Sequence, residues 1–185
     1  MTDIRKSRIL IIATNGFEQS ELTVPRDRLK EAGATVEVAS PDGKAIRGWK
    51  DKDWGDKVEV DLALSAVKPD QYDALVIPGG QMNPDTLRLD DAAMGLVKSF
   101  ISGGRIVAAI CHGPWLLVEA GVVRDRQVTS WKSIKTDVSN AGGHWVDKAV
   151  VNDNGIITSR SPKDLDAFVG KIIEEVQEGK HKRAA

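Results

Sequence analysis

The chain lacks most features of secreted, membrane-spanning and nucleotide-binding proteins. It has one cysteine among 185 residues, so no disulfide can form within the chain. Its apolar runs are short, and the run near the N-terminus ends at Asn15 and Gly16, which predicts neither a signal segment nor a membrane span. The motifs GxxxxGK and GxGxxG are both absent, so nucleotide binding has no support. We expect a protein of the reducing cytoplasm.

Charge of neither sign dominates. The 26 basic and 27 acidic residues give a net charge of −1 and are scattered together. Without a basic stripe, nucleic acid is not expected as the primary partner, and without a block of like charge no disordered arm is expected. The length suits one domain over residues 1–185, which would bury roughly 70% of its unfolded surface without metals or disulfides.

Apolar periodicity alternates between strands and helices. The expected strands are residues 9–13, 35–39, 73–77, 106–110 and 155–159, and the expected helices are residues 21–32, 90–102 and a last one ending near 178. This alternation predicts an α/β fold with a mainly parallel sheet covered on both faces. Residues 43–61 break the rhythm and indicate an inserted hairpin or flap. Ser161 is expected to cap the last helix with Asp164 as the capping-box acid, and residues 180–185 to form a frayed tail.

The single cysteine, Cys111, follows the apolar run 105–110 and precedes His112, Gly113 and Pro114. A strand that turns sharply into a helix exposes the side chain at the corner and points the first helical N–H groups at it. Such positions lower a thiol pKa to between ~3.5 and ~7.5, so we expect a thiolate near neutral pH. A lone cysteine is more often a small buried hydrophobe. The strand-to-helix context favours a nucleophile instead.

Polar groups and glycines follow three of the expected strands. They are residues 15–18, 78–80 and 111–112. Because sites in open α/β sheets form beyond the carboxyl ends of the strands, these groups should meet. We expect the N–H groups of Gly80 and His112, next to Gly79, to stabilise an oxyanion.

Glu18 and His112 each allow two interpretations. Glu18 either stabilises the start of a helix as a first-turn acid, or faces Cys111 as a buried, protonated hydrogen-bond donor to the sulfur. His112 is the obvious base by residue type. Sequence neighbours at a sharp turn usually point apart, however, so His112 would act through a third group or as a structural cap.

No metal site is expected. His144 and His181 have no second ligand at a spacing typical of metal sites, and we interpret both as surface residues.

Five blocks in order resemble the PfpI/ThiJ superfamily, in its branch of PfpI-type intracellular proteases, general stress proteins and protein deglycases. The blocks are GFEQSEL at 16–22, DALVIPGG at 73–80, AICHGP at 109–114, NAG at 140–142 and TSRSPKDL at 158–165. The resemblance implies a flavodoxin-like three-layer α/β sandwich with a nucleophile elbow. It also implies that Cys111 is the nucleophile, Glu18 its protonated partner and His112 the adjacent histidine. In PfpI-type proteases a neighbouring subunit contributes a carboxylate after the PGG loop, and Asp85 stands at that place here, with aspartate where the protease has glutamate.

The function implied by this resemblance is a cysteine-dependent hydrolase that protects against stress, without a cofactor, as a homodimer or higher homo-oligomer. Its expected substrates are glyoxal or methylglyoxal adducts of proteins, small aldehydes, or peptides, and no membrane partner is expected. An alternative is a redox-sensing or chaperone-like stress protein whose Cys111 is oxidised rather than turning over substrate. A glutamine amidotransferase needs a downstream His-x-Glu, which does not occur after Cys111.

Overall fold

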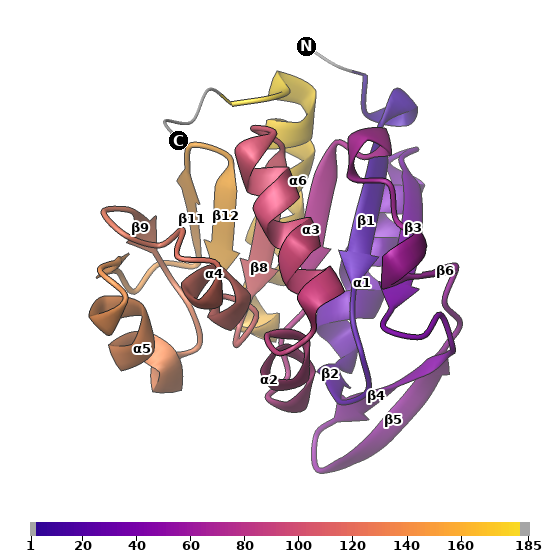
Figure 1. Cartoon of the computed structure of the whole chain (residues 1–185), viewed down its shortest axis with the longest axis horizontal. Helices are drawn as coiled ribbons and strands as arrows, with labels where there is room; N and C mark the ends of the chain where they lie inside the picture. Colours follow the sequence, from indigo (N-terminus) through magenta and orange to yellow (C-terminus); the bar gives the residue numbers. More distant parts are fainter. Residues whose placement is uncertain (1–2, 182–185) are drawn as a thin grey trace.

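The computed structural model describes residues 3–181 and arranges them around a seven-stranded sheet in the order β11-β12-β8-β7-β1-β3-β6 (Figure 1). Its strands are β1 (Arg8–Ile12), β3 (Thr35–Ser40), β6 (Leu62–Ala63), β7 (Ala74–Ile77), β8 (Ile106–Ile110), β11 (Val150–Asp153) and β12 (Ile156–Ser159). Every neighbouring pair is parallel except β11 with β12. The predicted α/β fold with a mainly parallel sheet is confirmed.

Helices cover both faces of the sheet (Figure 1). The helices α1 (Gln19–Glu31) and α6 (Leu165–Glu178) pack on one face, and α3 (Asp91–Ser102) and α4 (Trp115–Glu119) on the other. The shorter helices are α2 (Met82–Leu87), α5 (Lys135–Asn140) and the 3-10 turns η1 (Ile4–Lys6), η2 (Leu64–Ala66), η3 (Pro69–Gln71), η4 (Lys132–Ile134) and η5 (Pro162–Asp164). Among residues 3–181, no helix has both the length and the apolar character needed to cross a bilayer.

The continuous apolar runs follow from this double cover. In β8, Ile106, Ala108 and Ile110 pack on the side of α1 and α6, while Val107 and Ala109 pack on the side of α3 and α4. Because both faces of the strand are buried, hydrophobic and polar residues do not alternate along it. The same double burial holds β8 rigid up to the residue at which it ends.

A hairpin lies within residues 43–61. Its strands β4 (Ile46–Lys50) and β5 (Asp53–Val58) pair antiparallel, and β4 also pairs with β2 (Phe17–Glu18). The strands β9 (Gln127–Val128) and β10 (His144–Trp145) form a further two-stranded sheet. Through the pairing of β4 with β2, the hairpin is attached to the chain segment that joins β1 to α1.

Two local expectations at the C-terminal end need revision. The Ser161 side chain makes no capping hydrogen bond, because Asp164 pairs instead with Arg160 at 2.9 Å and α6 begins only at Leu165. Of the expected tail, residues 182–185 lie outside the described residues. The N–H of His181 donates to the carbonyl of Gly104 at 2.8 Å, so this part of the segment is held to the body of the protein.

The core between the sheet and α6 should depend strongly on Phe168, which is fully buried. We expect Phe168→Ala to lower the free energy of unfolding by about 3–5 kcal/mol, since it leaves a cavity. Urea denaturation measures the loss. Leu89 is 84% exposed, so Leu89→Ala should change the same quantity by less than about 0.5 kcal/mol. Similar losses in both variants would contradict this assignment of the core.

Candidate active site

Cys111 occupies the sharp turn directly after β8. Its φ is 63°, in the left-handed region that costs a non-glycine residue on the order of 1–3 kcal/mol. Two backbone hydrogen bonds hold it there: the Cys111 N–H donates to Ser159 O at 3.0 Å, and the Trp131 N–H donates to Cys111 O at 2.8 Å. The strained conformation is thus fixed by β12 on one side and by the segment before η4 on the other.

The turn also requires glycine at two neighbouring positions. A Cβ on Gly113 would lie 2.7 Å from Ile77 O, and a Cβ on Gly79 would lie 2.6 Å from the Cβ of Cys111. Both distances are too short for real side chains. The loops after β7 and β8 can therefore approach each other closely only with glycine at these places.

His112 faces Cys111 rather than pointing away from it. Its Nδ1 lies 3.3 Å from the Cys111 Sγ, and its Nε2 lies 3.2 Å from the Ser133 Oγ. The expectation that the two neighbours point apart is wrong because Trp115 and Trp131 contact the imidazole, with ring centroids 5.2 and 6.3 Å away. Burial lowers the pKa of His112, so the imidazole is neutral at pH 7 and can accept a proton.

The buried acid beside the thiol is Glu21, not Glu18 as predicted. Glu21 is 0% exposed, its Oε2 accepts a hydrogen bond from the Gly79 N–H at 2.8 Å, and its carboxyl interacts with Cys111. Within residues 3–181, its Oε1 is buried without a hydrogen bond of normal geometry. A proton on Oε1 would make this oxygen a donor toward the sulfur.

Glu18 lies outside this contact. As the last residue of β2 it accepts a hydrogen bond from Ser20 Oγ at 3.2 Å and lines a groove of about 520 Å³ with Gln19, Thr23, Lys50, Asp51 and Pro162. Burial raises its pKa, and the Ser20 hydrogen bonds oppose that shift. Glu21 had a recognisable signal in the sequence: it shares one face of α1 with the buried residues Leu22, Pro25 and Leu29.

The protonation states of Glu21 and Cys111 depend on each other. Burial raises the pKa of Glu21 to about 8, so this carboxyl is largely protonated at pH 7. Burial also raises the pKa of the Cys111 thiol, ionised Glu21 raises it further, and the N–H groups of Gly80 and His112 lower it. Burial is the largest of these effects and shifts the pKa of the thiol upward, opposite to the direction expected from the sequence. Cys111 is 7% exposed, and α4, with only five residues, begins four residues after it.

The two amides expected to bind an oxyanion both act on the sulfur. The N–H groups of Gly80 and His112 hydrogen-bond to the Cys111 side chain. Gly79 does not join them, because its N–H donates to Glu21. The structure thus brings together Cys111, His112 and the Gly80 amide as predicted, and adds Glu21 and Ser133.

Asp85 is placed apart from these residues. It lies exposed on α2, and within the described part of the chain no hydrogen bond or ion pair joins it to His112. Its contribution from a neighbouring subunit stays a prediction.

A parallel α/β sandwich with a cysteine at a strained strand end defines the class of this protein. The DJ-1/PfpI family profile matches residues 7–175. A deglycase of Pyrococcus abyssi is 45% identical over 167 residues, covering 90% of this chain and 98% of the relative. Protein/nucleic acid deglycase 2 of Escherichia coli is 40% identical over 163 residues, covering 87% and 92%. The crystal structure of Drosophila melanogaster DJ-1beta matches with a TM-score of 0.85 at 33% identity, covering 93% of this chain and 91% of that chain. The chain belongs to the DJ-1/PfpI family and has its flavodoxin-like fold.

The raised pKa of Glu21 makes folding pH-dependent. The unfolded chain loses this proton near pH 4.5, whereas the folded chain holds it to about pH 8, so stability from this group falls as pH rises between those values. We expect Glu21→Gln, which has no proton to lose, to gain stability relative to the wild type by several kcal/mol from pH 5 to pH 8, on the order of 1.4 kcal/mol per pH unit.

Chemical denaturation at pH 5, 6.5 and 8 measures this difference. Glu31→Gln, at the exposed end of the same helix, is the control and should follow the wild-type curve. Parallel curves for wild type and Glu21→Gln would show that Glu21 is ionised in the folded protein.

Proposed function

We propose that this chain is a cysteine-dependent deglycase or glyoxalase-type hydrolase, acting on glyoxal or methylglyoxal adducts or on the free aldehydes. The proposal depends on one observation above all: the Cys111 Sγ lies 3.3 Å from Nδ1 of a neutral, half-buried imidazole. Relatives named deglycases, at 45% and 40% identity, support it.

The first step is attack by Cys111 on the carbonyl carbon. The sulfur–carbon bond forms, the S–H proton moves to His112 Nδ1, and the carbonyl electron pair moves to oxygen. For Nδ1 to accept this proton, the ring proton is on Nε2. The Nε2–H group then donates a hydrogen bond to Ser133 Oγ, 3.2 Å away. The new oxyanion faces the Gly80 and His112 amides and then takes back the proton from His112 Nδ1, giving a hemithioacetal and a neutral imidazole. Since the thiol, the imidazole and Glu21 all start uncharged, charge develops only as the bond forms.

Aldehydes suit this site better than peptides. Peptide hydrolysis must protonate an amine leaving group, which calls for a histidine held by a carboxylate. Within residues 3–181, His112 has a hydroxyl at Nε2 and no carboxylate. Attack on a free aldehyde expels no leaving group, so a neutral imidazole is sufficient. The amine of an adduct keeps a basic lone pair, unlike a peptide nitrogen, and can take the proton that His112 Nδ1 accepted from the thiol.

The redox-sensor alternative is disfavoured by the same surroundings. Peroxide reacts with the thiolate of an accessible cysteine. Burial raises the pKa of Cys111, and Cys111 itself is buried, which both disfavour reaction with peroxide.

Turnover measured on three substrates tests the proposal. We expect the wild type to turn over methylglyoxal and a methylglyoxal-modified peptide, and to leave a fluorogenic peptide largely uncleaved. Cys111→Ser should lose about 10³-fold or more of this activity, because the hydroxyl is a far weaker nucleophile without a strong base. Undiminished activity in Cys111→Ser, or cleavage of the fluorogenic peptide alone, would contradict the proposal.

We assign Ser133 a positioning role, because its Oγ lies 3.2 Å from His112 Nε2 and can orient the imidazole. We expect Ser133→Ala to lower kcat by about tenfold, part of the 10²–10⁴ that a general base contributes, and to shift the pH profile of kcat. Ser139→Ala, another exposed hydroxyl, is the control and should leave kcat unchanged. An unchanged pH profile in Ser133→Ala would exclude a positioning role.

The Asp85 prediction requires an assembly. If Asp85 reaches His112 of a neighbouring subunit, Asp85→Ala lowers turnover, and mixing it with Cys111→Ser chains restores part of it through hybrid sites. A monomer in sedimentation, or no recovery of activity despite subunit exchange, would contradict the shared site. Asp85 would then be only a surface residue of α2.

A further inference from the structure

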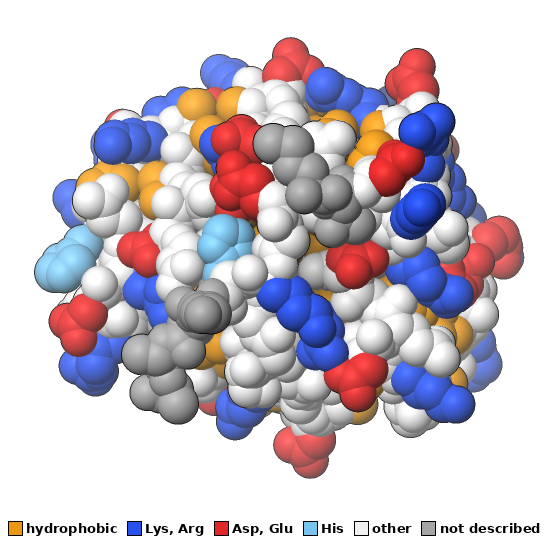
Figure 2. All heavy atoms as spheres, turned by 90° about the horizontal axis from the view of Figure 1, so that it is seen from above, with side chains coloured by type: hydrophobic (Ala, Val, Ile, Leu, Met, Phe, Trp, Pro, Cys, Tyr) orange, Lys and Arg blue, Asp and Glu red, His pale blue; other side chains and the backbone are white. Residues whose placement is uncertain are grey.

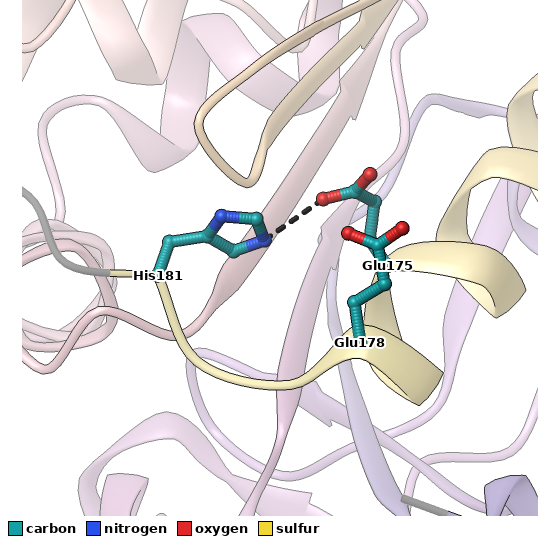
Figure 3. Close-up of side chains that lie close together, drawn as sticks. All are labelled: Glu175, Glu178 and His181. Carbon is teal, nitrogen blue, oxygen red and sulfur yellow. Dashed lines mark ion pairs between the residues drawn. The ribbon is translucent and has the colours of Figure 1, made fainter. Parts of the chain in front are cut away.

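Three metal-ligating side chains meet at the end of α6, at the edge of the sheet opposite Cys111. They are Glu175, Glu178 and His181, whose ligand atoms all lie within 4.8 Å of one another (Figure 3). Because α6 runs back along the sheet after β12, its last turn lies near Gly104, where the chain enters β8. Figure 2 looks onto this end of the molecule and shows acidic side chains near a histidine on its surface.

The backbone holds the three residues together. Glu175 and Glu178 are three residues apart, so they lie on the same face of the helix. The helix ends at Glu178, and Gly179 turns the chain with a φ of 96°. The His181 N–H then donates to Gly104 O at 2.8 Å, which places the imidazole over the helix end (Figure 3).

Two atoms in this cluster are buried without a hydrogen bond. They are the Glu175 Oε2 and the His181 Nε2, which lie 2.8 Å apart in an ion-pair contact and, within residues 3–181, have no hydrogen-bond partner. The Glu175 side chain is 3% exposed, and its other oxygen accepts from Asn152 Nδ2 at 2.5 Å. A buried carboxylate oxygen and an imidazole nitrogen thus converge on each other and, within residues 3–181, have no further polar partner.

We propose that Glu175, Glu178 and His181 form a binding site for a divalent transition metal of the Zn²⁺ type. One imidazole nitrogen and two carboxylate oxygens are donors that zinc accepts, and water would complete a tetrahedron. Zinc bonds of about 2.0–2.2 Å place donor atoms about 3.4 Å apart. The Glu175–His181 contact would open by about half an ångström, and the exposed Glu178 would close toward them.

The surroundings fit a divalent cation. Two carboxylates balance a charge of +2. Asn152 donates a hydrogen bond to the buried Glu175 carboxylate and orients it, as residues behind metal ligands commonly do. The pKa of Lys171 is raised by its hydrogen bond to Glu174 and further by Glu175 and Glu178, as expected in a negative local field. An imidazole ligand disfavours Ca²⁺ and Mg²⁺, which prefer oxygen.

Bound metal would join the end of α6 to the turn before β8. We therefore expect it to stabilise the fold without changing turnover at Cys111, which lies at the other end of β8. This revises the expectation that His181 is only a surface residue. The other two proposed ligands, Glu178 and Glu175, are three and six residues before His181 in the sequence. The turn at Gly179 brings the three side chains together.

Calorimetric titration with Zn²⁺ tests the site, using Cys111→Ser throughout so that the thiol cannot bind the metal. We expect one Zn²⁺ per chain and a raised Tm. Added Glu178→Gln or His181→Ala should weaken binding at least tenfold and remove the Tm increase. Glu174→Gln and His144→Ala are matched controls, one residue before Glu175 and on distant β10, and should bind like the parent.

Three results would overturn the proposal. They are no binding of Zn²⁺ by the parent protein, binding unaffected by both Glu178→Gln and His181→Ala, and Ca²⁺ affinity equal to that for Zn²⁺. The first two would mean that Glu175 and His181 form an ion pair only, and the third that the site does not select a transition metal.

Discussion

The burial of the Glu21 carboxyl beside Cys111 is the constraint on which the chemistry of this site depends. Removing a carboxylate from water is so unfavourable that the group keeps its proton, and its pKa rises to about 8. Glu21 comes from α1, accepts from the PGG loop after β7 and contacts the cysteine after β8. One side chain thus joins three chain segments at the cysteine.

In the proposed mechanism, an uncharged site lets a buried thiol act as the nucleophile. A thiol beside a neutral imidazole is stable while the site is empty of substrate, and the proton moves only when carbon–sulfur bonding begins. The amides of Gly80 and His112 are fixed by the strained turn at Cys111, so they need no reorganisation to face a developing oxyanion. Glu175 and His181 lie at the opposite end of β8, where the proposed metal would stabilise the fold without affecting Cys111.

Much of this architecture could be predicted from the sequence. Strands such as β8 are buried on both faces and appear as unbroken apolar runs, and the convergence of strand ends places the Gly80 and His112 amides near Cys111. The sequence indicates Glu18 as the buried acid, whereas the structure has Glu21 there. The choice depends on the pairing of β2 with β4, which holds Glu18 away from Cys111 before α1 begins. Ser133 comes from a segment packed against the elbow by tertiary contacts, so no local pattern indicates it.

The protonation of Glu21 at neutral pH is the central claim, and carboxyl-carbon NMR of glutamate-labelled protein tests it most directly. The Glu21 signal is assigned by its loss in Glu21→Gln. The account predicts a titration midpoint at about pH 8, with the carboxyl still protonated at pH 7. A midpoint at or below the ordinary value of 4.5 would contradict it, because an ionised Glu21 would then oppose every step that begins at the sulfur.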